Sequence, residues 1–506
     1  MPQYKVSVKW GKEKFKDVDC NTDEAPVEFK ATLFSLSGVQ PDRQKVMMKG
    51  ITLKDDSWGT LKLKDGVTFL MMGSADALPE APVERPKFME DMTEAQLNTA
   101  LDLPAGLTNL GNTCYMNATL QCLRAVPELK EALERYKGSM TMGEAVIPAQ
   151  GITAGMRDLF KTMEASGEPI PPFIFLQRMH TAFPQFAEKS EQGGGFAQQD
   201  ANECWTEMVR CLQQKLPGSP EEQQGDGASS KGFIDQYMKG EFAVSMKCSE
   251  AEEEEPVQTS ETFYQLSCFI NQEVKYMHTG LKNRLAENIT KNSPSLGRDA
   301  VYVKSSKISR LPAYLSIQFV RFYFKEKEAV NAKILKDVKF PMTLDVFDLC
   351  SEDLQQKLKP MRDRFKEEED RLVEIADKAK QEGVKVEDIR GETKSLPYSF
   401  PDEKGSNNSG YYELTAVLTH RGRTSSSGHY VAWVRRKEDE WIMFDDDNVN
   451  GVTTEDILKL SGGGDWHCAY VLLYAPKVLQ VPINPPKIET KPTEAATETT
   501  AKMDTS

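Results

Sequence analysis

The sequence predicts an α+β protein with two folded parts of very different size, and three features of the 506-residue chain support this. Residues 1–74 alternate between strand and helix patterns within the length of a small domain. Residues 75–103 contain three prolines among small and charged side chains, which is typical of a linker. A second run of helix and strand patterns covers 104–476 and is long enough to bury a large core. Residues 477–506 have too few apolar side chains to fold.

The N-terminal part has the element order hairpin, helix and two further strands. YKVSVKW and KFKDVDC alternate as two strands around Gly11, and VEFKATLFSLSGV has the spacing of an amphipathic helix that ends at Gly38. KVMMKG and VTFLMMG are two further short strands. This order resembles ubiquitin, and the resemblance implies a ubiquitin-like β-grasp domain.

The end of this domain differs from ubiquitin. Gly73 is followed by Ser74 and more chain, so the free Gly-Gly tail that conjugation needs is absent. We therefore interpret residues 1–74 as a built-in docking domain. Met47 and Leu70 are expected on its apolar partner-binding surface, although methionine in a strand more commonly belongs to the core.

Composition narrows the class of partner and the compartment. The chain carries 63 Lys and Arg against 77 Asp and Glu, a net charge of −14, and it has no dense basic stripe with interleaved aromatic residues. We therefore expect no nucleic-acid partner, and a basic partner fits better. There is no signal peptide and no run of 18 apolar residues, so we expect no transmembrane segment. We therefore expect a soluble protein of the cytoplasm or the nucleus, with reduced thiols.

The nine cysteines are scattered along the chain without a C-x-x-C pair. This spacing excludes a disulfide framework, and it also excludes a zinc site built from four cysteines or from two cysteines and two histidines. We therefore predict neither a metal nor another cofactor.

Three segments interrupt the packing pattern of the larger part. Residues 217–231 and 249–256 are predicted to be exposed loops, and 361–395 is so highly charged that it predicts a solvated helical insertion. None of the three suggests chemistry.

The first candidate for chemistry is Cys114, within G-L-T-N-L-G-N-T-C-Y-M-N-A-T-L-Q-C-L. Gly111 and a capping Asn112 or Thr113 precede it, and apolar residues follow at helical spacing. We expect Cys114 in the first turn of a buried helix, where free backbone N–H groups and the helix dipole favour a nucleophilic thiolate. The alternative is an inert core cysteine, which the exposed, glycine-flanked approach argues against. We prefer that alternative for the cysteines in apolar patterns, which are Cys122, Cys204, Cys211 and Cys468.

A thiolate needs a base, and His429 is the most distinctive of the five histidines. It follows the polar loop R-G-R-T-S-S-S-G and begins the strand H-Y-V-A-W-V, and a second strand, W-I-M-F-D, ends at Asp445. A hairpin centred on Lys437 would place Trp433 opposite Trp441 and His429 opposite Asp445, with Cβ atoms roughly 4.5–5.5 Å apart. The carboxylate could then orient and stabilise the imidazole. A one-residue slip would turn Asp445 to the other face.

Other interpretations of these residues stay open. Asp446 is the second candidate for the carboxylate, and a solvated acidic turn is the alternative without a function. A lone histidine in a sheet is more commonly structural, but here the loop, the strand and the acid agree. Three of the remaining histidines are interpreted as structural: His180, His278 and His467. The fourth, His420, is expected to line the cleft.

Three boxes in this order resemble the ubiquitin-specific protease family of cysteine deubiquitinases. They are G-L-T-N-L-G-N-T-C-Y-M-N-A-T-L-Q around Cys114, Q-Q-D-A-N-E-C-W from Gln198 to Trp205, and Y-E-L-T-A-V-L-T-H-R-G-R-T-S-S-S-G-H-Y from Tyr412 to Tyr430. The resemblance covers nearly all of 104–476 and implies a papain-like catalytic domain with thumb, palm and fingers. Papain itself fits less well, because its base is expected ~150 residues after the nucleophile.

The resemblance implies a role for several residues. Cys114 would be the nucleophile, His429 the base and Asp445 the residue that orients it. Asn109 would supply an oxyanion-hole donor together with the Cys114 backbone N–H, although it could be only a turn residue. The resemblance also implies three substrate-binding residues: Asp200 would pair with an arginine of the ubiquitin tail, and Gln198 and Tyr430 would line the channel for its Gly-Gly end.

The resemblance is strongest to the proteasome-associated members of the family that carry an N-terminal ubiquitin-like domain. It implies ubiquitin and polyubiquitinated proteins as substrates, and the 26S proteasome regulatory particle as a partner of residues 1–74. A zinc-free finger subdomain, roughly 233–290, would be held by ordinary sheet packing. The loop before His429 could cover the cleft, and Ser426 within it matches a basophilic kinase pattern. The alternative function is a largely non-catalytic, ubiquitin-binding regulator of the proteasome.

Overall fold

The computed structural model divides the chain into two compact units, Met1–Asp91 and Met92–Ser506. It describes residues 3–59, 61–74, 103–138, 147–190, 195–219, 231–251, 253–325, 330–383, 385–425, 427–464 and 466–483. Most of the predicted linker and tail, and Ser426, lie outside these ranges. Within them, no helix is both long enough and apolar enough to cross a bilayer.

The first unit is a five-stranded mixed sheet packed on one helix. The sequence predicts the helix and four of the strands, and the short strand Ile51–Thr52 is an additional one. The strand order is β2-β1-β5-β3-β4, with β1 and β5 parallel in the centre. Helix α1 starts with Pro26 and ends at Gly38, whose φ of 70° only glycine adopts easily. The elements are β1 (Gln3–Trp10), β2 (Glu13–Asn21), α1 (Pro26–Ser37), β3 (Lys45–Met48), β4 (Ile51–Thr52) and β5 (Thr68–Met72).

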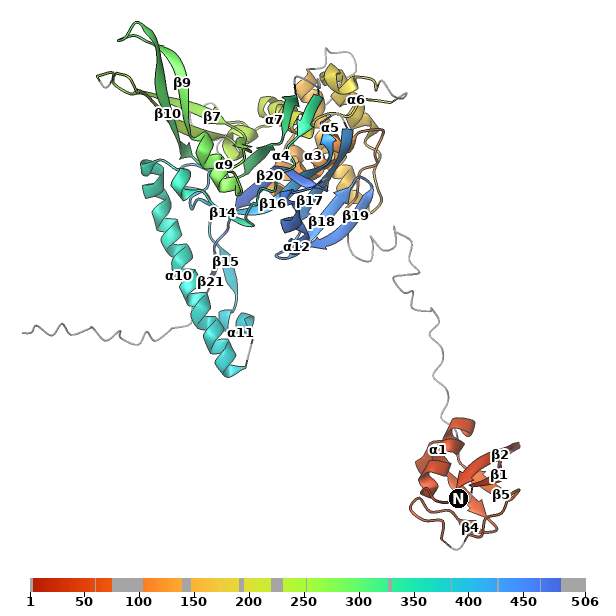
Figure 1. The fold of residues 1–506 in the computed structure, drawn as a ribbon. Helices are drawn as coiled ribbons and strands as arrows, with labels where there is room; N and C mark the ends of the chain where they lie inside the picture. The colour runs from red at the N-terminus through yellow and green to blue at the C-terminus, as the bar shows by residue number, and fades with distance from the viewer. Residues whose placement is uncertain are drawn as a thin grey trace, which may run out of the picture. The chain divides into compact units, whose positions relative to one another are not determined.

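The second unit starts with a helical subdomain built around α3. Every residue of α3 from Cys114 to Leu123 is buried, because the helix lies between the other helices and the central sheet and packs on both α7 and β17 (Figure 1). The helices are α3 (Cys114–Arg124), α4 (Pro127–Arg135), α5 (Pro148–Ala165), α6 (Phe173–Ala182), α7 (Ala201–Lys215) and α8 (Phe233–Tyr237).

The central sheet has the order β19-β18-β17-β16-β20-β11-β8. β13 and β14 pair with the two ends of β16, and β12 pairs with β13. Neighbouring side chains alternate between the faces of the central sheet: Leu418 and Tyr430 join the core under the helices, whereas Val417 and Val431 join a second core on the other face. The strands are β8 (Leu266–Phe269), β11 (Leu315–Val320), β12 (Phe322–Lys325), β13 (Val330–Lys333), β14 (Thr343–Asp345), β16 (Tyr411–Thr424), β17 (Ser427–Arg435), β18 (Glu440–Asp445), β19 (Asn448–Thr453) and β20 (Cys468–Pro476). Two short helices flank them, α9 (Met277–Arg284) and α12 (Thr454–Leu458).

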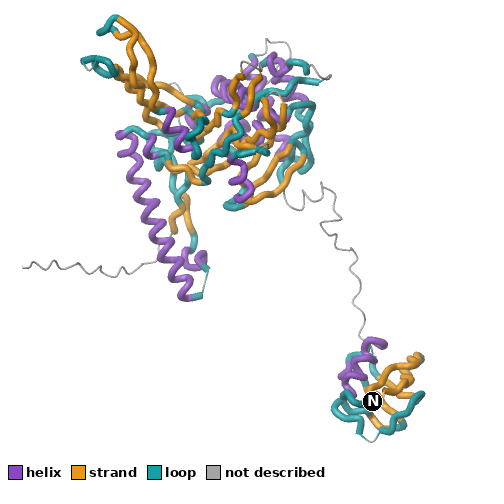
Figure 2. Tube along the Cα trace, in the orientation of Figure 1, coloured by secondary structure: helices purple, strands orange, loops and turns teal. Residues whose placement is uncertain are grey.

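A separate four-stranded sheet, β7-β6-β10-β9, forms the fingers (Figure 2). A small cluster of Cys248, Ala300 and Tyr302 packs near its end. The predicted acidic loop joins β6 to β7, and Glu254 in it accepts hydrogen bonds from the Tyr302, Ser293 and Ser295 hydroxyls. The strands are β6 (Gly240–Cys248), β7 (Val257–Phe263), β9 (Ala286–Ser293) and β10 (Arg298–Arg310).

The charged insertion is helical, as predicted, but the helix begins earlier than residue 361. Helix α10 spans Glu352–Glu382 and continues through Pro360. Its start is fixed by Ser351, whose hydroxyl accepts from the Leu354 N–H, and by the burial of Leu354 and Leu358. After α10 the insertion contains α11 (Val386–Arg390) and β15 (Thr393–Ser395), and β15 pairs with β21 (Gln480–Pro482).

Candidate active site

Cys114 begins helix α3, which confirms its predicted place in the first turn of a buried helix. The loop before it turns through two left-handed residues, Gly111 with φ 98° and Asn112 with φ 55°. Thr113 occupies the N-cap position, one of the two expected, but its side chain makes no capping hydrogen bond. The Asn109 side chain holds the loop before the helix: its Oδ1 accepts from the N–H groups of Gly111 at 2.9 Å and Thr113 at 3.2 Å. The thiol therefore lies at the positive end of the helix dipole.

Burial does not distinguish Cys114 from the other cysteines. All nine are buried, and Cys114 is 2% exposed. The loop before Cys114 is exposed at Gly111 and Asn112, as expected, but the thiol itself is not. Its surroundings are what differ. Gln198, from the segment that precedes α7, donates from Nε2 to the Cys114 Sγ at 3.5 Å. Thus two of the predicted site residues meet although 84 positions separate them.

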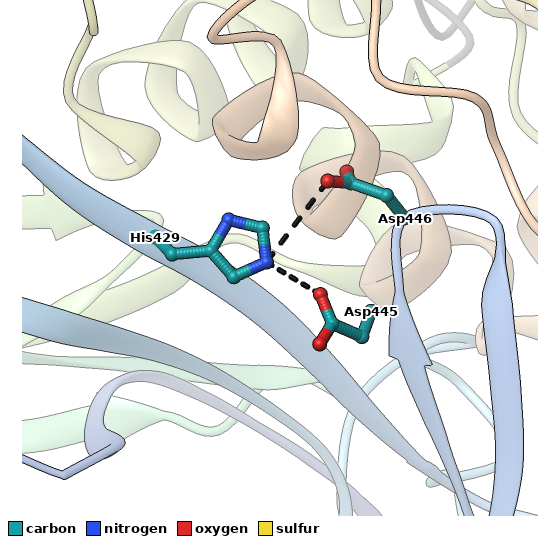
Figure 3. A group of neighbouring side chains, drawn as sticks. All are labelled: His429, Asp445 and Asp446. Carbon is teal, nitrogen blue, oxygen red and sulfur yellow. Dashed lines mark hydrogen bonds and ion pairs between the residues drawn. The ribbon is translucent and has the colours of Figure 1, made fainter.

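His429 and Asp445 also meet, at the edge where β17 begins and β18 ends (Figure 3). The His429 Nε2 lies 2.5 Å from Asp445 Oδ1 and 3.9 Å from Asp446 Oδ2. Both carboxylates therefore face one nitrogen of the imidazole, and Asp445 makes the close contact.

The predicted register of this hairpin is wrong. Trp433 pairs with Met443, and Arg435 pairs with Trp441, so Trp433 does not face Trp441 and His429 is not directly opposite Asp445. The turn closes around Glu438 instead of Lys437, because the N–H groups of Arg436 and Lys437 both donate to the Glu440 carbonyl. The error amounts to two pairing positions, so Asp445 stays on the face of His429 and reaches it diagonally.

The charge of His429 follows from its partners. The Asp445 hydrogen bond, and after it a hydrogen bond with Cys114, raise the pKa of His429 to about 10, although burial opposes this. The same contact with His429 lowers the pKa of Asp445. At neutral pH the pair is therefore an imidazolium next to a carboxylate, and Cys114 is a further hydrogen-bond partner of the imidazole.

Asp446 connects the histidine segment to the cysteine segment. It is 8% exposed and has a left-handed backbone with φ 56°. Its Oδ2 accepts from Asn109 Nδ2 at 2.8 Å, and its Oδ1 accepts from Asn117 Nδ2 at 2.9 Å. Burial raises its pKa, and the two amide hydrogen bonds act in the opposite direction.

His429, Asp445 and Asp446 form the one group of three or more His, Cys, Asp or Glu side chains in the described ranges whose possible metal-ligand atoms lie within 4.8 Å of one another. The His429 nitrogen that faces the carboxylates is bonded to Asp445, and both oxygens of Asp446 accept from asparagine amides. These atoms are therefore arranged to bond to one another, and a cation would have to displace those hydrogen bonds.

The amide of Asn109 is fixed by hydrogen bonds. Its oxygen serves the loop before α3, and one N–H of its Nδ2 group is directed at Asp446. An amide nitrogen carries two hydrogens, so the second is available to an oxyanion.

The predicted substrate-binding residues Asp200 and Tyr430 lie near the site, and they differ in their hydrogen bonds and in their burial. Asp200 caps α7 through the N–H groups of Asn202 and Glu203, and both of its oxygens accept from the Tyr470 hydroxyl at 2.8–2.9 Å. Burial raises its pKa. Tyr430 is fully buried in the core under the helices, so in this structure its side chain has no exposed surface with which to line the channel as expected.

The other histidines differ in their surroundings. His420 is fully buried and its pKa falls to about 3, so it lies in the core and does not line the cleft as expected. His467 is buried too, with its ring centroid 6.5 Å from that of His429. His278 is at the surface and pairs with Asp348.

Asn117 is a part of the site that the sequence analysis missed. It follows Cys114 by three residues, so it lies one turn further along α3. A signal was present in the sequence, because an asparagine in a buried helix needs hydrogen-bond partners.

The expected docking residues of the first unit are neighbours. Met47 on β3 pairs with Leu70 on β5, and the Leu70 side chain is 42% exposed. Exposed Met72 lies on the same strand face, next to Leu70. Both candidates are thus outside the core of the unit, which contains Phe69 and Met71.

Comparisons with known proteins agree on one family. The family described as "Ubiquitin carboxyl-terminal hydrolase" matches residues 105–474. Ubiquitin carboxyl-terminal hydrolase 7 of Arabidopsis thaliana is 42% identical over 491 residues, which are 94% of this chain and 99% of the relative. Ubiquitin carboxyl-terminal hydrolase 14 of Caenorhabditis elegans is 40% identical over 512 residues, 99% of each chain. Ubiquitin carboxyl-terminal hydrolase 6 of Schizosaccharomyces pombe is 38% identical over 489 residues, 93% of this chain and 98% of the relative.

Proposed function

Because the chain belongs to the ubiquitin carboxyl-terminal hydrolase family, we propose that it is a cysteine deubiquitinase that hydrolyses the bond at the C-terminal glycine of ubiquitin. Cys114 is the nucleophile, His429 the acid and base, and Asp445 the residue that orients the histidine. The observation that carries this proposal is the meeting of three segments: the thiol of α3 next to His429, and His429 Nε2 at 2.5 Å from Asp445 Oδ1.

The chemistry is an acyl transfer. The Cys114 thiolate attacks the carbonyl carbon of the last glycine, and the carbonyl oxygen becomes an oxyanion. His429 gives its proton to the leaving lysine amine as the C–N bond breaks, which produces a thioester. A water then attacks the thioester and transfers a proton to His429, and the thiolate leaves ubiquitin with a free carboxylate. The second N–H of Asn109 and the Cys114 backbone N–H would stabilise the oxyanion in both steps.

Ubiquitin's C-terminal tail is the substrate segment that we assign to Gln198 and Asp200. Gln198 contacts the nucleophile, so it lies where the last residues of the tail must pass. Asp200 has its oxygens engaged by Tyr470 and by α7, yet a carboxylate has about four acceptor positions, so it can also accept from an arginine. Tyr430 supports this region from the core.

Hydrolysis is tested with ubiquitin that carries a fluorogenic amide at its C-terminus, with and without added proteasomes. The wild-type chain should release the fluorophore under at least one condition, and Cys114→Ala should abolish release. Cys122→Ala is the matched control, because it is a buried cysteine of the same helix. Release that persists in Cys114→Ala, or equal losses in both variants, would contradict the assignment.

Trimming or recycling of ubiquitin at the proteasome is the cellular role that we propose, with residues 1–74 as the docking domain. Support comes from the β-grasp topology of the first unit and from the cross-strand pair of half-buried Met47 and exposed Leu70. The relative from Caenorhabditis elegans matches 99% of this chain, so its match includes this unit as well. The same role would place the protein in the cytoplasm or the nucleus.

Docking is tested by co-sedimentation of the full chain with purified 26S proteasomes. Leu70→Glu places a charge in the apolar surface and should reduce co-sedimentation at least tenfold. Phe34→Glu is the control, because it puts the same charge at an exposed apolar side chain on α1. Unchanged co-sedimentation of Leu70→Glu, or the same loss with Phe34→Glu, would refute docking through this surface.

A further inference from the structure

Asn117 joins three segments of the active site through one side-chain amide. It is 2% exposed, and it lies on α3 one turn after Cys114. Its Nδ2 donates to Asp446 Oδ1 at 2.9 Å, and it also approaches the carbonyls of Leu107 at 3.1 Å and Thr108 at 3.4 Å. The nucleophile's helix, the segment before it and the turn after Asp445 are thus connected at one point.

Asp446 is held tightly at this point. Its second oxygen accepts from Asn109, and its backbone carbonyl accepts from the Leu107 N–H at 2.9 Å. Gly106 lies so close that an added Cβ would be 2.7 Å from the Asp446 carbonyl oxygen. Neither the turn nor the facing segment can therefore shift without breaking several contacts.

We propose that Asn117 is a positioning residue for the hydrolase reaction: by holding the Asp446 carboxylate, it aims the Asn109 amide at the oxyanion and keeps a negative charge facing His429. This inference rests on the proposed function. Asn117 does not touch the substrate, and it acts through Asp446.

Two sets of contacts orient the Asn109 amide. The Gly111 and Thr113 N–H groups donate to its oxygen, and the ionised Asp446 carboxylate, which only accepts hydrogen bonds, takes its N–H side. A protonated Asp446 could donate instead, and the Asn109 N–H group would then lose the acceptor that helps to aim it at the oxyanion. Asn117 is the second amide that stabilises the ionised form, and burial opposes it.

The titratable groups that face Asp446 are His429 on β17, whose Nε2 lies 3.9 Å from Asp446 Oδ2, and Asp445 on β18. Cys114 of α3 forms a hydrogen bond with His429. His429 favours the ionised Asp446, and Asp445 disfavours it. Without Asn117, Asp446 should take up its proton at a higher pH.

The experiment compares Asn117→Ala with Gln121→Ala in the full chain. Gln121 lies one turn further along α3, is 3% exposed, and donates to the Ala105 carbonyl at 3.1 Å without contacting Asp446. Both variants lose a buried amide between α3 and the same segment. The measured quantities are kcat and KM for the fluorogenic ubiquitin amide from pH 6 to pH 9.

Asn117→Ala should lower kcat about tenfold at pH 7, the effect of losing one hydrogen bond to a charged group, and leave KM within about twofold. The acidic limb of its pH profile should move to higher pH, so that the deficit shrinks towards pH 9. Gln121→Ala should keep the wild-type profile. If Asn117→Ala does not fold, Asn117→Leu keeps the side-chain size and goes through the same comparison.

Asp446→Asn supplies a second readout. If Asn117 acts through Asp446, adding Asn117→Ala to Asp446→Asn should cost far less than it costs alone, whereas the Gln121→Ala effect should be additive. Additive effects, or equal pH profiles for the Asn117 and Gln121 variants, would overturn the inference. Failure of the proposed function is a different result, because the wild-type chain would then release no fluorophore.

Discussion

His429 lies between an acid and a thiol, and both neighbours determine its charge. The contact with Asp445 is the larger cause of its raised pKa, and the contact with Cys114 is the second. Its raised pKa means that the imidazole should keep its proton well above neutral pH. A proton is then ready for the leaving amine, and the positive ring stabilises the thiolate that attacks.

Asp445→Asn tests this charge. An amide cannot stabilise the imidazolium as a carboxylate does, so the pKa of His429 should fall from about 10 towards its usual 6.5. The alkaline limb of kcat/KM should therefore move to lower pH, and kcat should fall at least about 100-fold. Asp447→Asn, two residues along the same turn, is the control. An alkaline limb that stays in place in Asp445→Asn would contradict the charge assignment.

The same pair affects stability, and the sign follows from the direction of each shift. A raised histidine pKa contributes stability that is complete below about pH 6.5 and is lost as the pH rises through about 10. The lowered pKa of Asp445 limits this contribution at acidic pH. The difference in unfolding free energy between wild type and Asp445→Asn should thus be largest near pH 5–6 and vanish above pH 10, as urea titrations at several pH values can check. A constant difference across this range would contradict the ion pair.

A catalytic residue could be predicted from the sequence where its chemistry requires a particular side chain at a recognisable position, such as a helix start or a strand end. A cysteine at a helix start and a histidine next to a strand with an acid at its end are local patterns, and both were recognisable. The polar character of Asn117 was visible as well, but its contact with Asp446 and the central place of Asp446 could not be predicted from such patterns. The contact connects positions 329 apart in the chain, and only the fold brings them together.

At the scale of elements, the β17–β18 hairpin and α10 show what sequence patterns can decide. The alternation of side chains placed His429 and Asp445 on one face, and that part survives a register error of two. The register itself depends on which N–H groups reach the Glu440 carbonyl, and the turn sequence alone does not determine this. For α10, the predicted start follows Pro360, a residue that commonly begins or breaks a helix, whereas packing of Leu354 and Leu358 extends the helix further back.

The attachment of α10 depends on Arg362. Its guanidinium makes two hydrogen bonds with Asp345, at 2.9 and 2.7 Å, and lies 4.4 Å from the Phe347 ring and 4.1 Å from the Tyr411 ring. Arg362→Ala should lower the free energy of unfolding by about 1–3 kcal/mol and speed hydrogen exchange in the second half of α10. Turnover of ubiquitin amide should change less than twofold, because no catalytic residue contacts this helix.

Arg364→Ala is the control for this prediction, since Arg364 is an exposed arginine of the same helix. It should leave both stability and hydrogen exchange near the wild-type values. Equal effects of the two substitutions would mean that the contacts of Arg362 do not hold the helix.

At the scale of the whole molecule, the chain consists of two units with separate cores. The first unit is centred on residues such as Val8, Leu33 and Phe69, and the second contains the two large cores on either face of the central sheet. The fold class of the first unit was predictable, because its order of hairpin, helix and further strands could be recognised from the sequence. The division at Asp91 falls inside the predicted linker of 75–103.

Separate cores predict separate unfolding. Residues 1–91 produced alone should fold, with a cooperative thermal transition at the temperature that the same unit shows in the full chain. Residues 92–506 should keep their own transition and their turnover of ubiquitin amide. Calorimetry of the three samples checks this, and a shift of more than a few degrees in either transition would show that the units stabilise each other.

The central claim is that Cys114 attacks the C-terminal glycine of ubiquitin with the help of His429. The most direct measurement is the reaction of the full chain, with and without proteasomes, with ubiquitin that carries a thiol-reactive group in place of its last glycine. Mass spectrometry should locate one covalent adduct at Cys114, and Cys114→Ala should form none. The absence of an adduct under both conditions, or an adduct that persists in Cys114→Ala, would contradict the account.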